Sequence, residues 1–159
     1  MLFGNLMQLY FHDMSEFSPR DIDNQGRYSY QYFDSYWTDD GLYPFLIKVD
    51  GASSGFALVR ETEDGTMDMA EFFVLRKYRR HGVGAIAARA LFDTFPGWWE
   101  VRQEPTNFGA QKFWRGVIYE YTNGDFEDLT LDNDHWQGPV QRFDSRRSLQ
   151  SAGRVAKEA

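Results

Sequence analysis

The hydrophobic positions in the first half of the chain change from a helical period to a strand-like one. Residues 2–17 carry apolar side chains at every third or fourth position, and residues 28–37 repeat tyrosine at every fourth position. Short apolar runs follow, separated by the turn sequences Asp50-Gly51 and Glu63-Asp64-Gly65. We therefore predict two helices and then an antiparallel meander of strands at residues 45–49, 55–59 and 67–75.

The middle of the chain returns to the helical period for one segment. Residues 81–95 predict a helix and residues 98–102 predict a strand. A strand–helix–strand passage of this length is a crossover connection, so the strands at 67–75 and 98–102 are expected to be parallel.

The last part of the chain predicts a short helix and two closing strands. Asn107 is a suitable cap for a helix at 108–115. Strands are predicted at 119–121 and 139–143, and the acidic segment 123–138 between them is predicted to be a loop.

Length and composition are consistent with one domain. The chain has 159 residues, enough for a substantial core, and we place a single domain at 1–143 and a tail at 144–159. Aromatic residues make up 18% of the chain, so much of the buried surface must be ring surface. The expected fold class is α/β of the α+β type, with an antiparallel N-terminal meander, one parallel pair and flanking helices.

The composition of the chain disfavours several classes of function. The chain has no cysteine, and its three histidines are far apart, so disulfides, a cysteine nucleophile and a metal site are not expected. The net charge of −7 disfavours a nucleic-acid partner and suits a cationic ligand such as an amine. We see no basic leader and no apolar run of membrane-spanning length, so we expect a cytoplasmic protein without a membrane partner.

The strongest chemical signal is the turn from Arg79 to Ala85, which leads into the helix at 81–95. A helix N-terminus offers unpaired backbone N–H groups and partial positive charge, and glycines allow a ligand to approach the backbone closely. The turn contains Gly82 and Gly84 after a basic stretch, and this combination suits a phosphate or pyrophosphate. On these residues alone, a tight connection with solvated arginines is an equally good interpretation.

Two nucleotide-binding alternatives fit less well. A P-loop requires Gly-Lys-Ser or Gly-Lys-Thr, and neither triplet occurs. Residues 82–87 match the dinucleotide pattern Gly-x-Gly-x-x-Ala, as in an oxidoreductase. In that fold, however, the glycines follow the first strand directly, whereas here seven residues, 75–81, follow Val74 and a meander precedes it.

Two segments together resemble the GCN5-related N-acetyltransferase family (GNAT). Residues 73–84, Phe-Val-Leu-Arg-Lys-Tyr-Arg-Arg-His-Gly-Val-Gly, are similar to motif A, whose core is Arg/Gln-x-x-Gly-x-Gly/Ala. Residues 107–118 are similar to motif B, and residues 55–59 look like the strand that precedes motif A. The resemblance implies the GNAT fold, in which the parallel strands splay apart around acetyl-CoA. The family's first strand has no counterpart in the pattern, because the helical period begins almost at Met1.

The resemblance also implies a set of cofactor-binding residues. The pantetheine arm would bond the backbone of the motif A strand, the pyrophosphate would be held at the following turn, and the motif B helix would contribute further contacts. The residues at these positions are Phe72, Phe73, Val74, Arg79, Arg80, His81, Gly82, Val83, Gly84, Ala85, Asn107 and Trp114.

The implied reaction is direct acetyl transfer to a small-molecule or peptidic amine. Such an amine must lose a proton before it attacks, and Glu71 on the motif A strand is the candidate general base, with Glu100 and Glu104 as rivals. Glu71 is equally well interpreted as a solvated strand residue. Trp114 takes the position of the tyrosine that often protonates the leaving thiolate. Either Tyr119, Tyr121 or water is then the donor, or the thiolate leaves unprotonated. An acyl-CoA-binding protein without turnover remains open, and the aromatic-rich surface is compatible with a homodimer.

Overall fold

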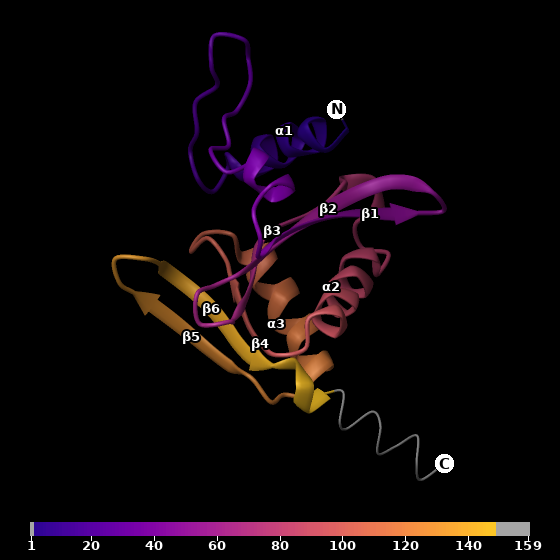
Figure 1. Ribbon diagram of the computed structural model, residues 1–159, viewed down its shortest axis with the longest axis vertical. Coiled ribbons are helices and arrows are strands. Elements are labelled where there is room, and N and C mark those ends of the chain that lie inside the picture. Colours follow the sequence, from indigo (N-terminus) through magenta and orange to yellow (C-terminus); the bar gives the residue numbers. More distant parts are fainter. Residues whose placement is uncertain (1, 149–159) are drawn as a thin grey trace.

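The computed structural model describes residues 2–148, which form a mixed sheet with helices on both faces (Figure 1). The elements in chain order are α1 (Leu2–Met14), η1 (Asp34–Trp37), β1 (Leu42–Val49), β2 (Ala52–Glu61), β3 (Met67–Val74), η2 (Arg76–Tyr78), α2 (Val83–Thr94), β4 (Trp98–Arg102), α3 (Phe108–Thr122), β5 (Glu127–Asp132) and β6 (Gln137–Asp144). No helix in this part of the chain is both long and apolar enough to cross a lipid bilayer.

The sheet has the strand order β1-β2-β3-β4-β6-β5, and only β3 and β4 run parallel. This confirms the predicted mixed sheet with its N-terminal antiparallel meander and crossover helix. The order differs from a doubly wound dinucleotide-binding sheet, which is mostly parallel.

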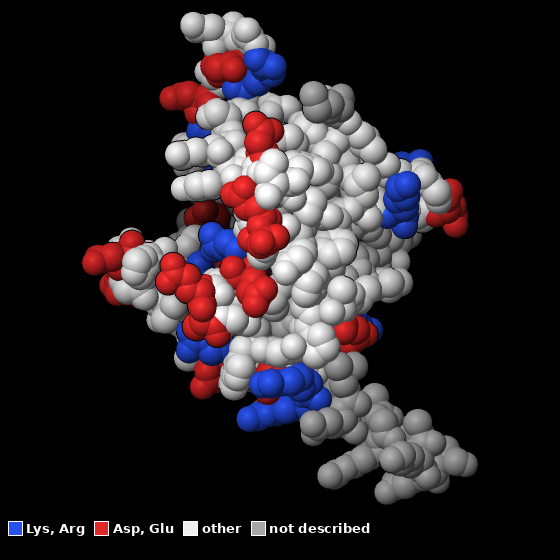
Figure 2. All heavy atoms as spheres, in the orientation of Figure 1, with Lys and Arg blue, Asp and Glu red and all other residues white. Residues whose placement is uncertain are grey.

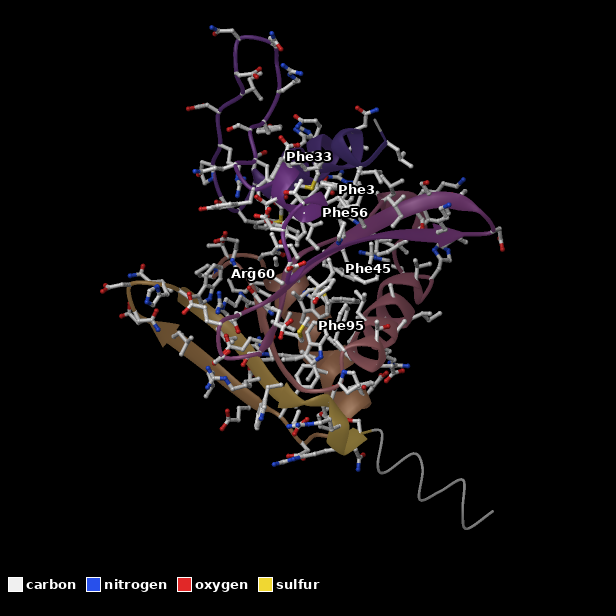
Figure 3. The ribbon with its side chains drawn as sticks, viewed as in Figure 1. Phe3, Phe33, Phe45, Phe56, Arg60 and Phe95 are labelled. Atoms are coloured by element: carbon white, nitrogen blue, oxygen red, sulfur yellow. The ribbon has the colours of Figure 1, made fainter. Side chains whose placement is uncertain are left out.

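Each face of the sheet has its own aromatic core. On one face α1 packs against the meander, and the ring of Phe3 lies 5.0 Å from that of Phe56. On the other face α2 and α3 cover the sheet, and Phe45 lies 5.9 Å from Phe95 (Figure 3). Strand β2 contributes side chains to both cores, because successive residues of a strand point to opposite faces.

The parallel pair separates soon after it forms. Its register contains two residue pairs, Met67 with Trp99 and Asp68 with Glu100. Beyond Asp68, β3 continues beside β2 alone, and its register with β2 shifts between Leu58 and Val59 so that Ala70 is an extra residue in β3. Such a bulge re-aims the side chains beside it. The two strands therefore diverge toward the end of β3 that leads into α2.

The predicted helix at 28–37 is wrong except for its last residues, which form the short η1. The backbone of Tyr28 is held by Gln8 of α1 instead: the Tyr28 N–H donates to Gln8 Oε1 at 2.8 Å, and Gln8 Nε2 donates to the Tyr28 carbonyl at 3.0 Å. These side-chain bonds replace helical ones. The regularly spaced tyrosines also do not share one buried face, since Tyr36 is buried and Tyr32 is exposed.

The predicted end of the chain also needs correction. The helix expected at 108–115 continues to Thr122, so the strand expected at 119–121 is helical. Val117 and Ile118, in the added part of this helix, are buried. The expected loop at 123–138 contains β5, whose partly buried Leu129 and Leu131 alternate with exposed neighbours. Of the expected tail, Ser145 is buried, and residues 149–159 lie outside the described residues.

Candidate functional site

The turn into α2 exposes helix N–H groups beside two glycines with different roles. Gly82 adopts a left-handed conformation, with φ of 78°, and a Cβ there would meet nothing within 4 Å. A Cβ on Gly84 would lie 3.1 Å from the Phe113 ring, so this glycine allows α2 to pack on α3. Arg80 is also left-handed, with φ of 63°. The first backbone N–H groups of α2 have no partner within the helix, as in any helix N-terminus, and no side chain at Gly82 stands beside them.

Arg79 is held on the α1 side of this turn. Its Nε donates to the Val74 carbonyl at 2.7 Å, and its Nη2 donates to Asp13 Oδ2 at 2.5 Å. Arg76 donates to the other oxygen of Asp13 at 2.7 Å. Partial burial would raise the pKa of Asp13, but the hydrogen bonds and charges of the two arginines outweigh it and lower that pKa. The side chains of Arg80 and His81 are exposed in the same turn.

The segment Phe72 to Val74 lies beyond the last β3–β4 residue pair, Asp68 with Glu100, where the two strands have separated. This separation between β3 and β4 is called the opening below. Phe72 faces the α2–α3 side, where its ring stacks 6.1 Å from Phe113, and Phe73 faces the α1 side. On the edge that faces β4, the backbone of β3 has no ladder partner beyond Asp68 within residues 2–148. Unpaired strand edges bond readily to another extended chain.

Asn107 and Trp114 differ in how far they are open to a ligand. Asn107 Oδ1 accepts the Ala110 N–H at 3.0 Å and caps α3, while its Nδ2 lies 4.0 Å from Met14 Sδ at the end of α1. Trp114 is only 5% exposed, and its ring packs 5.0 Å from Phe72 in the core. The indole is therefore part of the wall beneath the opening.

Glu71 lies on the bulge of β3, on the face that α1 covers. Its Oε2 accepts a hydrogen bond from Tyr10 of α1. Burial raises the pKa of Glu71 to about 7, although the Tyr10 hydrogen bond and the positive charge of Arg20 lower it. Burial also raises the pKa of Tyr10 well above its ordinary value, so Tyr10 stays a neutral donor. A carboxyl with a pKa near neutrality can accept a proton at physiological pH.

The same face carries a row of charges that the sequence patterns did not reveal. Asp68 is 3% exposed and bonds Arg60, and Arg102 lies 3.9 Å from it. Arg102 also pairs with Glu100 at 3.0 Å, and Glu100 pairs with Arg142 at 2.5 Å. Asp68 and Glu100 alternate with apolar neighbours along their strands, but only strand pairing shows that the five charged side chains form one row.

A hollow of about 550 Å³ opens over this row. Its lining residues are Thr62, Glu63, Asp64, Thr66, Asp68, Glu100, Arg102 and His135. Figure 2 shows acidic side chains gathered around a smaller basic group on the side of the molecule where the β5–β6 hairpin lies. Arg60 points toward this side from β2 (Figure 3).

The two remaining predicted residues are not brought together with Glu71. Glu104 lies just before α3, where its backbone carbonyl accepts a hydrogen bond from Gln111 at 3.1 Å. Tyr119 lies on α3, on the opposite face of the sheet from Glu71, and is 60% exposed. Residues 2–148 contain no group of His, Asp and Glu side chains arranged to hold a metal ion.

Comparisons with known proteins bear on the family and the fold. The model of the acetyltransferase (GNAT) family matches residues 6–117. An acetyltransferase from Thermus thermophilus has 11% identity, covers 89% of this chain and 90% of its own, and has a TM-score of 0.64. A GNAT acetyltransferase from Staphylococcus aureus has 14% identity, coverage of 90% and 93%, and a TM-score of 0.63.

A third similar structure was solved with acetyl-CoA bound. This GNAT acetyltransferase from Elizabethkingia anophelis has 11% identity, covers 73% of this chain and 83% of its own, and has a TM-score of 0.55. A search of curated protein sequences gave no match. At these identities the structural likeness concerns the fold.

Proposed function

This chain belongs to the acetyltransferase (GNAT) family, and we propose that it transfers an acetyl group from acetyl-CoA to a primary amine of a small-molecule or peptidic acceptor. The observation that carries the proposal is the position of Glu71. This carboxyl lies on the β3 bulge, where β3 has just separated from β4, and its pKa is about 7. A base of this strength beside an open strand edge suits deprotonation of an ammonium group.

Acetyl-CoA fits the features of the opening. The free N–H groups at Gly82 and the start of α2 would hold the pyrophosphate, with Arg80 as the nearby exposed cation. The unpaired edge of β3 from Phe72 to Val74 would bond the amides of the pantetheine arm. Trp114 would support the arm from below through its contact with Phe72.

The reaction then needs one proton acceptor on the protein. Glu71 removes a proton from the acceptor ammonium, and the neutral nitrogen attacks the thioester carbonyl carbon. The C–N bond forms and the C–S bond breaks, and sulfur leaves with the electron pair of the C–S bond. The nitrogen then loses its second proton to the departing sulfur or to water. A thiol has a pKa of about 8.5, so departure as thiolate carries a small penalty at neutral pH. No tyrosine at position 114 is therefore required.

The acceptor is expected to be a cation that approaches over the row of charges. Within residues 2–148, Glu63 and Asp64 line the hollow without an arginine partner, whereas Asp68 and Glu100 are paired. The chain as a whole carries −7, which favours the approach of an ammonium group.

The test is release of CoA thiol from acetyl-CoA across a panel of primary amines. We expect amine-dependent release by the wild type and a loss of about 100-fold in kcat for Glu71→Gln, because general base catalysis contributes at least this much. Retained activity in Glu71→Gln, with the same loss in Glu104→Gln, would assign the base to Glu104. Absence of acetyl-CoA binding by the wild type would contradict the whole proposal.

A second candidate is an acyl-CoA-binding protein without turnover. The burial of Trp114 and the exposed position of Tyr119 on α3 favour it, because they leave no tyrosine in the usual donor position. In that case thiol release would be unchanged by any amine, although acetyl-CoA would still bind.

A further inference from the structure

The end of α1 is bonded to the loop that leads into α2. Asp13 Oδ1 accepts from Arg76 at 2.7 Å and Asp13 Oδ2 accepts from Arg79 at 2.5 Å, across more than sixty residues of sequence. The Asp13 side chain is 18% exposed, whereas that of Arg76 is 75% exposed and that of Arg79 is 42% exposed. The bond to Arg79 is therefore the better shielded of the two, and shielding strengthens an ion pair.

The Arg79 side chain lies against the side of the sheet that α1 covers. Its Cζ lies 5.6 Å from the centre of the Phe73 ring, which belongs to the core beneath α1. Its Nε bonds the last carbonyl of β3. The start of α2, by contrast, packs through Gly84 on Phe113, which belongs to the core on the opposite face. The guanidinium thus joins the end of β3 to α1.

The backbone between these two points is unusual. Arg80 and Gly82 both have positive φ, of 63° and 78°, and a non-glycine residue adopts such a conformation only at a cost. Arg79 is the residue immediately before this segment. A fixed Arg79 side chain would therefore keep the following N–H groups in the orientation that an anion needs.

We propose that Asp13 is a positioning residue for cofactor binding, which acts through Arg79 to hold the Arg79–Gly82 backbone in its phosphate-binding conformation. The inference rests on the proposed function, because it takes this turn to be the site of the CoA pyrophosphate. It also gives α1 two roles, since Tyr10 lies one turn earlier on the same helix and bonds Glu71. One helix thus contacts both the base and the cofactor loop.

When the Asp13 carboxylate is removed, a purely electrostatic effect and a positioning effect change the affinity for CoA in opposite directions. Removing a negative charge near a phosphate site tightens anion binding if the effect is only Coulombic. Removing a group that holds the loop weakens binding. Glu16 is the matched control, because it is an exposed acid one turn beyond Asp13 whose charge also acts on Arg76 and for which no bond to Arg79 is present.

The experiment is calorimetric titration of the full chain with CoA. We expect Asp13→Asn to raise the Kd about threefold to tenfold, as for loss of a partly shielded ion pair. Asp13→Glu should recover part of the affinity, and Glu16→Gln should leave Kd unchanged or lower it. An Asp13→Asn protein that binds CoA as tightly as the wild type, or more tightly, would overturn the inference.

A double-mutant cycle with Arg79→Gln tests the route of the effect. If Asp13 acts through Arg79, Asp13→Asn will have little further effect on Kd in the Arg79→Gln background. Full additivity would show that Asp13 acts by another route. Thermal unfolding of each variant identifies any that fail to fold, and Arg79→Gln then tests the same contact from its other side. Failure of the wild type to bind CoA would refute the proposed function, an outcome distinct from equal binding by wild type and variant.

Discussion

Replacing Glu71 by glutamine should change how stability depends on pH. In the folded protein the pKa of Glu71 is about 7, against an ordinary value of 4.5, chiefly because the carboxyl is buried. A raised folded-state pKa means that the folded protein binds the proton more tightly than the unfolded chain. The stability that the protonated carboxyl contributes is therefore fully present below pH 4.5 and is lost as the pH rises to 7.

The size of the effect follows from the two pKa values. One pKa unit corresponds to about 1.4 kcal/mol, so the full difference corresponds to about 3 kcal/mol. Part of this stability is already lost at a pH of about 5, and about 2.5 kcal/mol more is lost between pH values of about 5 and about 8.5. Glutamine does not ionise, so Glu71→Gln should escape this loss.

Urea unfolding of both proteins across this pH range provides the assay. The free energy of unfolding of the wild type should fall relative to that of Glu71→Gln by about 2.5 kcal/mol as the pH rises. A constant cost of burying the amide cancels, because only the change with pH is compared. Glu63→Gln is the control, since Glu63 is exposed in the β2–β3 turn. Parallel pH dependences for the wild type and Glu71→Gln would refute the burial argument.

Three further outcomes test the site and the fold. Gly82→Glu should raise the Kd for CoA at least about tenfold by calorimetry, because it places bulk and negative charge at the pyrophosphate site; a side chain at a φ of 78° is strained, which should lower stability by about 1 to 3 kcal/mol, but no atom within 4 Å clashes with it. Tyr10→Phe removes a hydrogen bond that lowers the pKa of Glu71, so the acidic limb of the pH–rate profile should move about one unit or more to higher pH; an unmoved limb would contradict the role of Glu71 as base. Gly55→Ala should lower the free energy of unfolding by about 3 kcal/mol or more, since its Cβ would lie 2.0 Å from the Phe73 carbonyl oxygen.

Features with a local cause were predictable from the sequence. The β4 strand at Trp98–Arg102 and the helix start near Gly82 follow from hydrophobic period and turn residues, which depend on neighbours a few positions away. The same reasoning placed Glu71 on a strand. Local reasoning failed for residues 28–37, where the tyrosine period mimics a helix but bonds to Gln8, twenty residues away, decide the backbone.

Tertiary structure alone decided how the site is assembled. Hydrophobic period and turn residues were enough to predict α1, the strands β1 to β4 and α2, together with the glycines of the turn and a carboxylate on the motif A strand. Only strand pairing could show that β3 leaves β4 after Asp68 and that the Ala70 bulge turns Glu71 toward α1. The bonds of Asp13 to Arg79 and of Tyr10 to Glu71 likewise join residues more than sixty positions apart. The physical reason is that such contacts depend on how whole elements pack, which no local period or propensity encodes.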